Sequence, residues 1–234
     1  MIEAVIAQVP ASLAAFGGRI AAGVDRPGTQ SLSTLRSRAA FDAVIDGFGR
    51  PFGPADRRAV VSLWTQSYLA ALIIPYFTAL SRLGQALPIA FDRTGFECDE
   101  AGTISRFLLS DAEPPLAGSE AALAPLVDEH LRPFFDLCHA HSGVSRRVLW
   151  TNAGVAADVT LRALNLDAGL AAPIAAQAEA CLSRCDADAF GRCPLAQAFA
   201  AGERRRRVCC MRYRLPGIAS CGAACPVDHP KAPC

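Results

Sequence analysis

The chain has 234 residues, of which 52% are hydrophobic and 19% are charged, and its net charge is +1. These values are typical of a globular protein rather than a disordered one, and the length suits one large domain or a domain with a small appendage. The near-neutral charge gives no support for nucleic-acid binding or for adsorption to an anionic membrane. Because Lys231 is the only lysine, the composition is biased towards arginine, and a single arginine carries little weight.

The N-terminal sequence lacks the pattern of an export signal. It has no early basic residue, it carries Glu3, and Pro10 interrupts its short apolar run. We therefore expect a cytoplasmic protein, with at most peripheral contact with the inner membrane. In that compartment the ten cysteines are expected to be reduced or bound to metal rather than paired in disulfides.

Most of the chain has the hydrophobic spacing of helices. The expected helical segments are residues 1–24 (one or two short helices), 32–48 (capped by Ser31 or Ser33), 55–83, 119–140, 145–164 and 168–187. Pro75 is expected to kink or divide the third of these. The stretch 63–80 within it is nearly long enough to cross a membrane, but its polar residues and Pro75 favour a buried core helix.

A different pattern covers residues 87–111, where two short apolar runs flank turn-rich polar residues. This pattern predicts a β-hairpin, with the isolated Cys98 as a packing residue. The expected fold class is therefore mainly α (α+β), with a helical body over 1–192 and a cysteine-rich segment over 193–234 packed on it.

Four cysteines near the C-terminus are the strongest chemical signal, with the spacing C-C-x10-C-x3-C: Cys209, Cys210, Cys221 and Cys225. A [2Fe–2S] cluster needs four protein ligands, two on each iron, and these are usually cysteine thiolates. Pro216 and Gly217 favour a turn that returns the chain to the first pair. The small residues between the last two cysteines allow the backbone to approach a cluster and to donate N–H bonds to sulfur.

Spacing alone leaves a structural zinc site, or no metal, as alternatives. Zinc sites usually pair ligands two to four residues apart, which suits the last two cysteines but not the adjacent first two, whose side chains diverge. A second group, Cys181, Cys185 and Cys193, is interpreted as packing residues. A metal site there would need a further ligand, such as His139 or Cys138, and oxidation could pair Cys181 with Cys185 in a regulatory disulfide.

The histidines show no metalloprotease spacing, and the sequence has no glycine-rich nucleotide fingerprint, phosphate loop or serine nucleophile motif. Direct hydride transfer from NAD(P)H is therefore not expected, and electrons would come from a partner. Seven arginines against one acidic residue lie between Ala189 and Leu215. They form either a solvated basic face or a patch that raises a cluster's potential and attracts anionic partners.

The cysteine segment resembles the C-terminal motif of the FhuF-like ferric-siderophore reductase family. The stretch RYRLPG (residues 212–217) resembles the sequence that lies between the two cysteine pairs in that family. SRRVLWTNAGVA (145–156), with Trp150 and Asn152, and the region around Trp64 and Pro75 are also similar. The family's last pair is C-x2-C, whereas this chain has C-x3-C. The fourth ligand is therefore Cys225 or the terminal Cys234, and we favour Cys225 because it precedes Pro226 and the terminus is prone to fraying.

The resemblance implies a reductase that passes one electron from a [2Fe–2S] cluster to a bound Fe(III)-siderophore and releases Fe(II) in the cytoplasm. Reduction weakens binding by the siderophore's hard oxygen donors. The implied electron donor is a ferredoxin or an NAD(P)H-dependent reductase. Two alternatives remain: a non-enzymatic helical binding protein with a structural zinc site made by the four cysteines, and an iron–sulfur redox sensor.

Overall fold

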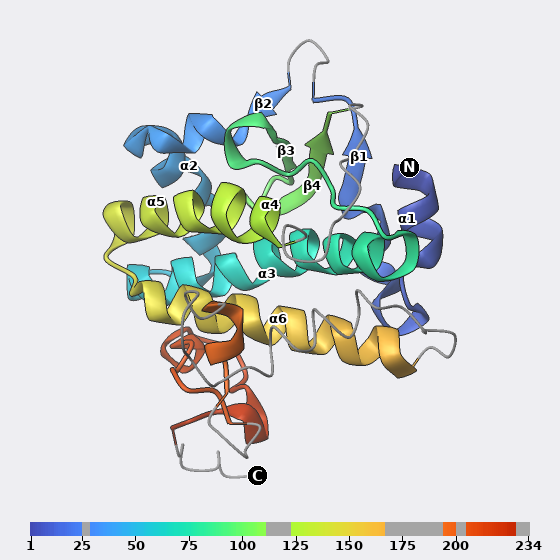
Figure 1. Ribbon diagram of the computed structural model, residues 1–234. Helices are drawn as coiled ribbons and strands as arrows, with labels where there is room; N and C mark the ends of the chain where they lie inside the picture. Colours follow the sequence, from blue (N-terminus) through green and yellow to red (C-terminus); the bar gives the residue numbers. More distant parts are fainter. Residues whose placement is uncertain (25–28, 111–122, 167–193, 200–204, 228–234) are drawn as a thin grey trace, which may run out of the picture.

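The core is built on two long helices that pack against each other, α3 (Arg57–Thr78) and α6 (Arg146–Leu166). The computed structural model describes residues 1–24, 29–110, 123–166, 194–199 and 205–227 (Figure 1). A small sheet lies on one side of this helical layer, and the C-terminal segment lies on the other. The predicted mainly α fold with a little β structure is confirmed.

Helix α3 is buried almost all round, as expected for a core helix. The helical run from Arg57 to Leu83 is long and apolar enough to span a membrane, but 78% of its most apolar window is buried inside the protein. Pro75 does not divide the helix, because packing on all sides holds the chain helical as far as Thr78. The irregularity comes just after it, in a π-helical turn, η4 (Ala79–Leu83), which ends at Gly84 in the left-handed region (φ 65°).

The sheet has four strands in the order β1-β4-β3-β2, in which β1 and β4 are parallel and the other pairs are antiparallel: β1 (Ile20–Ala22), β2 (Gln30–Ser31), β3 (Gly95–Cys98) and β4 (Ile104–Leu109). The hairpin expected within 87–111 is confirmed as β3 and β4. The prediction of helix throughout residues 1–24 is wrong at its end, where β1 follows α1 (Ile2–Gln8) and the 3-10 helix η1 (Ala11–Arg19). Strands of two or three residues are too short to display the alternation that identifies a strand.

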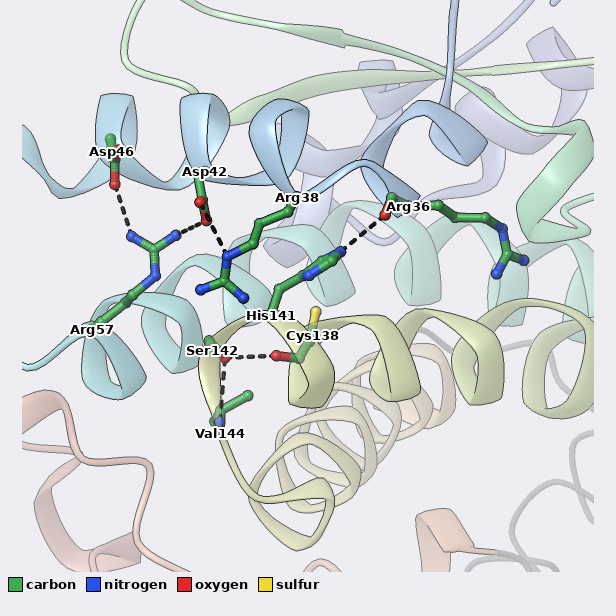
Figure 2. Close-up of polar contacts among 9 residues, drawn as sticks. All are labelled: Arg36, Arg38, Asp42, Asp46, Arg57, Cys138, His141, Ser142 and Val144. Atoms are coloured by element: carbon green, nitrogen blue, oxygen red, sulfur yellow. Dashed lines mark hydrogen bonds and ion pairs between the residues drawn. The ribbon is translucent and has the colours of Figure 1, made fainter.

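The expected helix over 32–48 is two elements, the 3-10 helix η2 (Leu32–Arg36) and α2 (Arg38–Gly49). Ser31 caps the first, since its hydroxyl accepts a hydrogen bond from the Ser33 N–H at 3.2 Å. The extended backbone of Ser37 separates the two. Figure 2 shows how Arg57, at the start of α3, bonds to Asp42 and Asp46 and thereby ties α2 to the core helix.

The helix expected over 119–140 is confirmed from residue 124 onwards as one helical run of three elements: α4 (Ala124–Leu126), the π-turn η6 (Val127–Leu131) and α5 (Arg132–Ser142). The run ends at Gly143, whose φ of 72° is the left-handed conformation common after helices. Helix α6 confirms the prediction for 145–164. The expected helix over 168–187 and the boundary at 192/193 lie outside the described residues.

Aromatic side chains join α3 to the sheet and to α5. The Tyr68 ring stacks on Phe134 with centroids 3.9 Å apart, and it meets Phe107 of β4 edge to face at 4.9 Å. Three further 3-10 turns lie near the C-terminus: η7 (Pro194–Gln197), η8 (Arg212–Arg214) and η9 (Gly222–Ala224). The packing of η7 against α6 and of η8 against α3 positions the cysteines.

Candidate metal centre

The four cysteines predicted as ligands lie together beside α3 and α6. All four are reduced thiols. The sulfurs of Cys210 and Cys221 are 3.9 Å apart, and the Cys225 thiol is within hydrogen-bonding reach of both Cys209 and Cys221. The fold therefore brings the two halves of the motif, separated by ten residues, into one group.

Tight local turns bring the two cysteine pairs together. Met211 follows the first pair with a φ of 61°, the only positive φ of a non-glycine residue in the described part of the chain. Its N–H donates to the Cys209 sulfur at 3.3 Å. Such a conformation costs about 1–3 kcal/mol and tends to occur at functional sites. In the second pair, the Cys225 N–H bonds to the Gly222 carbonyl at 2.9 Å and closes the turn between the cysteines.

The thiol group is buried on one side and open on the other. Cys210 and Cys225 are 0% and 7% exposed, whereas Cys209 and Cys221 are half-buried. The pKa of Cys221 is raised to about 12, mainly by burial and secondly by the neighbouring Cys210 thiol. Burial also raises the pKa of Cys209. Four thiolates would repel one another here, so a bound cation is needed to hold them in the charged form that ligates metal.

The donor set fits a [2Fe–2S] cluster. Such a cluster takes four protein ligands, two on each iron, and these are usually cysteine thiolates. The Cys210 and Cys221 sulfurs, 3.9 Å apart, come from different cysteine pairs, so the fold offers ligands from both halves of the motif side by side. A structural zinc site uses the same four thiolates, so iron, sulfide and zinc content distinguish the two.

A buried polar network ties the first cysteine pair to the core helices. The Arg206 guanidinium is buried and donates to the Asn152 side-chain oxygen on α6. Asn152 in turn donates to the Ser62 carbonyl at 3.1 Å, and the Ser62 hydroxyl donates to the Cys210 carbonyl at 2.8 Å. Each of these groups is removed from water, so the network fixes the cysteine loop at one place on α3 and α6.

Two arginines of η8 anchor the loop between the cysteine pairs to the N-terminal half of α3. Arg212 donates to the Gln66 side-chain oxygen at 2.6 Å, and Arg214 donates to Asp56 at the same distance. Asp56 also caps α3, since it accepts the Arg58 N–H at 3.0 Å. Its hydrogen bond from the Arg58 side chain, with help from Arg214, lowers the pKa of Asp56 to about 2.

The turn η7 packs against α6 at a glycine. A Cβ at Gly154 would lie 2.6 Å from the Ala198 Cβ and still closer to the Leu195 carbonyl oxygen. Beyond this contact, Phe199 and Arg206 form a backbone bridge, and the Arg207 N–H bonds to the Ala198 carbonyl at 2.9 Å. Because residue 154 has no side chain, η7 can pack directly on α6. The contacts from Ala198 and Phe199 then hold Arg206 and Arg207 next to η7.

Among the residues singled out by resemblance, Asn152 takes part in the site and the two tryptophans are structural. Trp150 packs edge to face on Phe135 at 4.7 Å, and the Trp64 indole N–H donates to the Gly102 carbonyl at 3.1 Å. Sequence reasoning missed Ser62 and Gln66. The available signal was the presence of polar residues on an otherwise apolar core helix.

The described histidines have structural partners. The His130 ring donates from Nδ1 to the Ile89 carbonyl and accepts the Tyr68 hydroxyl at Nε2, 2.6 Å away, and burial lowers its pKa to about 4. His139 donates to the Val144 carbonyl at 2.9 Å. His141 donates to the Arg36 carbonyl at 3.1 Å (Figure 2).

The remaining cysteines divide into two groups. Cys98 packs against the core, as expected, and Cys138 is fully buried on α5. His139, also considered as a ligand of a second site, lies on α5 as well and bonds to the Val144 carbonyl. The other predicted candidates lie outside the described residues: Cys181, Cys185, Cys193 and the alternative ligand Cys234.

Two comparisons with known proteins bear on this site. Residues 62–215, well over half of the chain, match the sequence model of a family described as "Ferric iron reductase FhuF-like transporter". The matched region contains most of α3, all of α6 and the first cysteine pair, and it ends before Cys221. The chain is also similar to a protein of Escherichia coli (strain K12) named "Ferric siderophore reductase", with 23% identity over 180 residues, which cover 74% of this chain and 68% of the relative.

Proposed function

Because this chain belongs to the FhuF-like ferric iron reductase family, we propose that it reduces Fe(III) held by a siderophore and releases Fe(II) in the cytoplasm. The electron would come from a [2Fe–2S] cluster bound by four thiolates: Cys209, Cys210, Cys221 and Cys225. The name of the Escherichia coli relative supports a ferric siderophore as the substrate. Fe(II) suits hard oxygen donors less well than Fe(III), so one electron is enough to weaken the siderophore's hold.

The gathering of four thiols at one half-open place is the observation that carries this proposal. Cys210 and Cys225 form the buried side, and Cys209 and Cys221 form the side that reaches solvent. When bound, a [2Fe–2S] cluster accepts and donates one electron at a time. The exposed side is where a ferric complex would approach, because electron donor and acceptor must come close together.

The surface next to the thiols is basic. Arg205, Arg207 and Arg214 are exposed on the segment that carries the cysteines. Their charge would attract an anionic ferric complex or an acidic electron-donor protein. Since the sequence has no dinucleotide fingerprint, we assign the supply of electrons to a separate ferredoxin or NAD(P)H-dependent reductase.

We also propose a cytoplasmic location with no more than peripheral membrane contact. The support is that the most apolar helix, α3, is largely enclosed by the protein. In the described parts of the chain, few large hydrophobic residues are exposed, and they come from different segments: Met1, Ile6, Val159, Tyr213 and Val227. Single exposed hydrophobic residues of this kind do not form a membrane-binding surface.

The first test is to purify the protein without oxygen, record its visible spectrum and measure iron, acid-labile sulfide and zinc. About two irons and two sulfides per chain support the proposal. Cys209→Ser should remove the colour, whereas the matched control Cys98→Ser should keep it. Colourless wild-type protein with about one zinc per chain would instead indicate the binding protein.

The second test separates a reductase from a sensor. The cluster is reduced anaerobically with dithionite, excess reductant is removed, and a ferric hydroxamate or ferric catecholate is added with an Fe(II)-trapping dye. A reductase reoxidises and yields about one trapped Fe(II) per electron stored. A loaded protein that stays reduced with both complexes contradicts the proposed reaction.

A further inference from the structure

Arg206 differs from the arginines on either side of it. Its side chain is buried, with 4% of the residue exposed, whereas Arg205 and Arg207 are exposed. No other arginine, lysine, aspartate or glutamate in the described ranges is buried. An arginine is charged at all ordinary pH values, so a full positive charge lies inside the protein beside the cysteines.

The protein itself compensates this charge only in part. The guanidinium donates to the Asn152 side-chain oxygen, which is neutral, and no carboxylate of the described residues pairs with it. Its Nε is buried and has no hydrogen-bond partner among those residues. A buried charge left in this state is costly, and such groups are normally paired with an opposite charge.

The cysteine group is the source of that opposite charge. Through Asn152 and Ser62 the guanidinium belongs to the same buried network as the Cys210 backbone. Burial lowers the pKa of Arg206, and the thiols of Cys210, Cys221 and Cys209 act in the opposite direction. The backbone of Arg206 also lies beside the cysteines. Its N–H donates at 2.9 Å to the carbonyl of Ala224, which is in the turn between Cys221 and Cys225.

We propose that Arg206 is a positioning residue whose buried charge balances the thiolates and raises the reduction potential of the cluster, while Asn152 holds the guanidinium in place. The inference rests on the proposed function, since it presupposes the cluster. Reduction adds one negative charge to the cluster, and a fixed positive charge in a poorly solvated site favours that state. The exposed arginines are screened by water and salt and should have much less influence.

The test compares the midpoint potential of the holoprotein in variants that lose the same charge at different depths. In Arg206→Gln, the ratio of reduced to oxidised cluster at a fixed solution potential should fall at least about tenfold. For a one-electron couple this is a decrease of about 59 mV in the midpoint potential. The matched control Arg207→Gln should change the ratio less than about threefold, because its charge is already screened. Arg206→Lys keeps the charge and should restore most of the wild-type ratio.

A second variant covers the case in which Arg206→Gln does not retain a cluster. Asn152→Asp preserves the shape of the side chain and places a negative charge on the guanidinium, so it should lower the reduced fraction in the same direction. Equal shifts in Arg206→Gln and Arg207→Gln, or unchanged potentials in Arg206→Gln and Asn152→Asp with the cluster loaded, would overturn the role of Arg206. Because no siderophore is present, these outcomes leave the proposed reaction standing, whereas wild-type protein that never binds a cluster overturns both.

Discussion

The contact between Gly154 and η7 makes a sharp prediction about how the cysteine segment is held. An alanine at 154 would place a Cβ 2.6 Å from the Ala198 Cβ. Carbon atoms in contact prefer about 3.5–4.0 Å, so η7 would have to move by about 1 Å. The movement opens the packing of Leu195 and Ala198, which are 0% and 2% exposed.

The net effect follows from two opposing terms. Alanine in place of glycine inside a helix stabilises α6 by up to about 1 kcal/mol. Overpacking typically costs about 1–3 kcal/mol, and full burial of a leucine contributes about 1.5–3 kcal/mol, part of which is lost when η7 shifts. We expect the docking of η7 and of residues 205–210 to weaken by about 1–2 kcal/mol, while α6 itself is not weakened.

Amide hydrogen exchange can measure this local loss. The Arg206 and Arg207 amides bond to Ala224 and Ala198, so their protection should fall roughly 5- to 30-fold in Gly154→Ala, and cluster loss should accelerate. Gly18→Ala is the control, because a Cβ there meets no atom within 4 Å. Unchanged protection of the two amides would refute the anchoring role of η7, and an equal loss of protection in α3 would refute its local character.

Three further outcomes are expected. The pKa of His130 is about 4 in the folded protein, and its ordinary value is 6.5. Between pH 6.5 and 4 the imidazole is therefore protonated in the unfolded chain but neutral in the folded protein. The free energy of unfolding should fall by roughly 3 kcal/mol as the pH drops through this range. Urea unfolding at pH 6.5 and pH 4 measures this difference, and His130→Asn must show a shallower pH dependence. Asp56→Ala should lower the free energy of unfolding by about 1 kcal/mol, because it removes the cap of α3. Asp56→Asn keeps a capping oxygen and should lower it by less than half as much. Equal losses in thermal unfolding would mean that the charge pair with Arg214 matters more than the cap. At the positive φ of Met211, Met211→Val should lower iron and sulfide content while Met211→Asn should not, and equal loading of both would show that this turn is not needed.

Local patterns were enough to predict a large part of the molecule. The long core helix, the β3–β4 hairpin and the helical runs around α5 and α6 follow from hydrophobic spacing, which reports the face that each segment buries. The ligand set was chosen from spacing and residue type, and the four thiols do lie together. Its assignment to a [2Fe–2S] cluster stays a prediction until metal and sulfide are measured.

Only the tertiary structure decided what surrounds those thiols. Ser62 lies 148 residues from Cys210, and Asn152 lies 54 residues from Arg206, so no local pattern relates them. Nor does the sequence distinguish Arg206 from the arginines that flank it, because burial depends on which side chain turns towards the groups of α3 and α6. A sequence determines which segments have faces to bury and which residues can ligate a metal. The packing of distant segments determines which polar groups leave water together, and the energy of those groups depends on that shared environment.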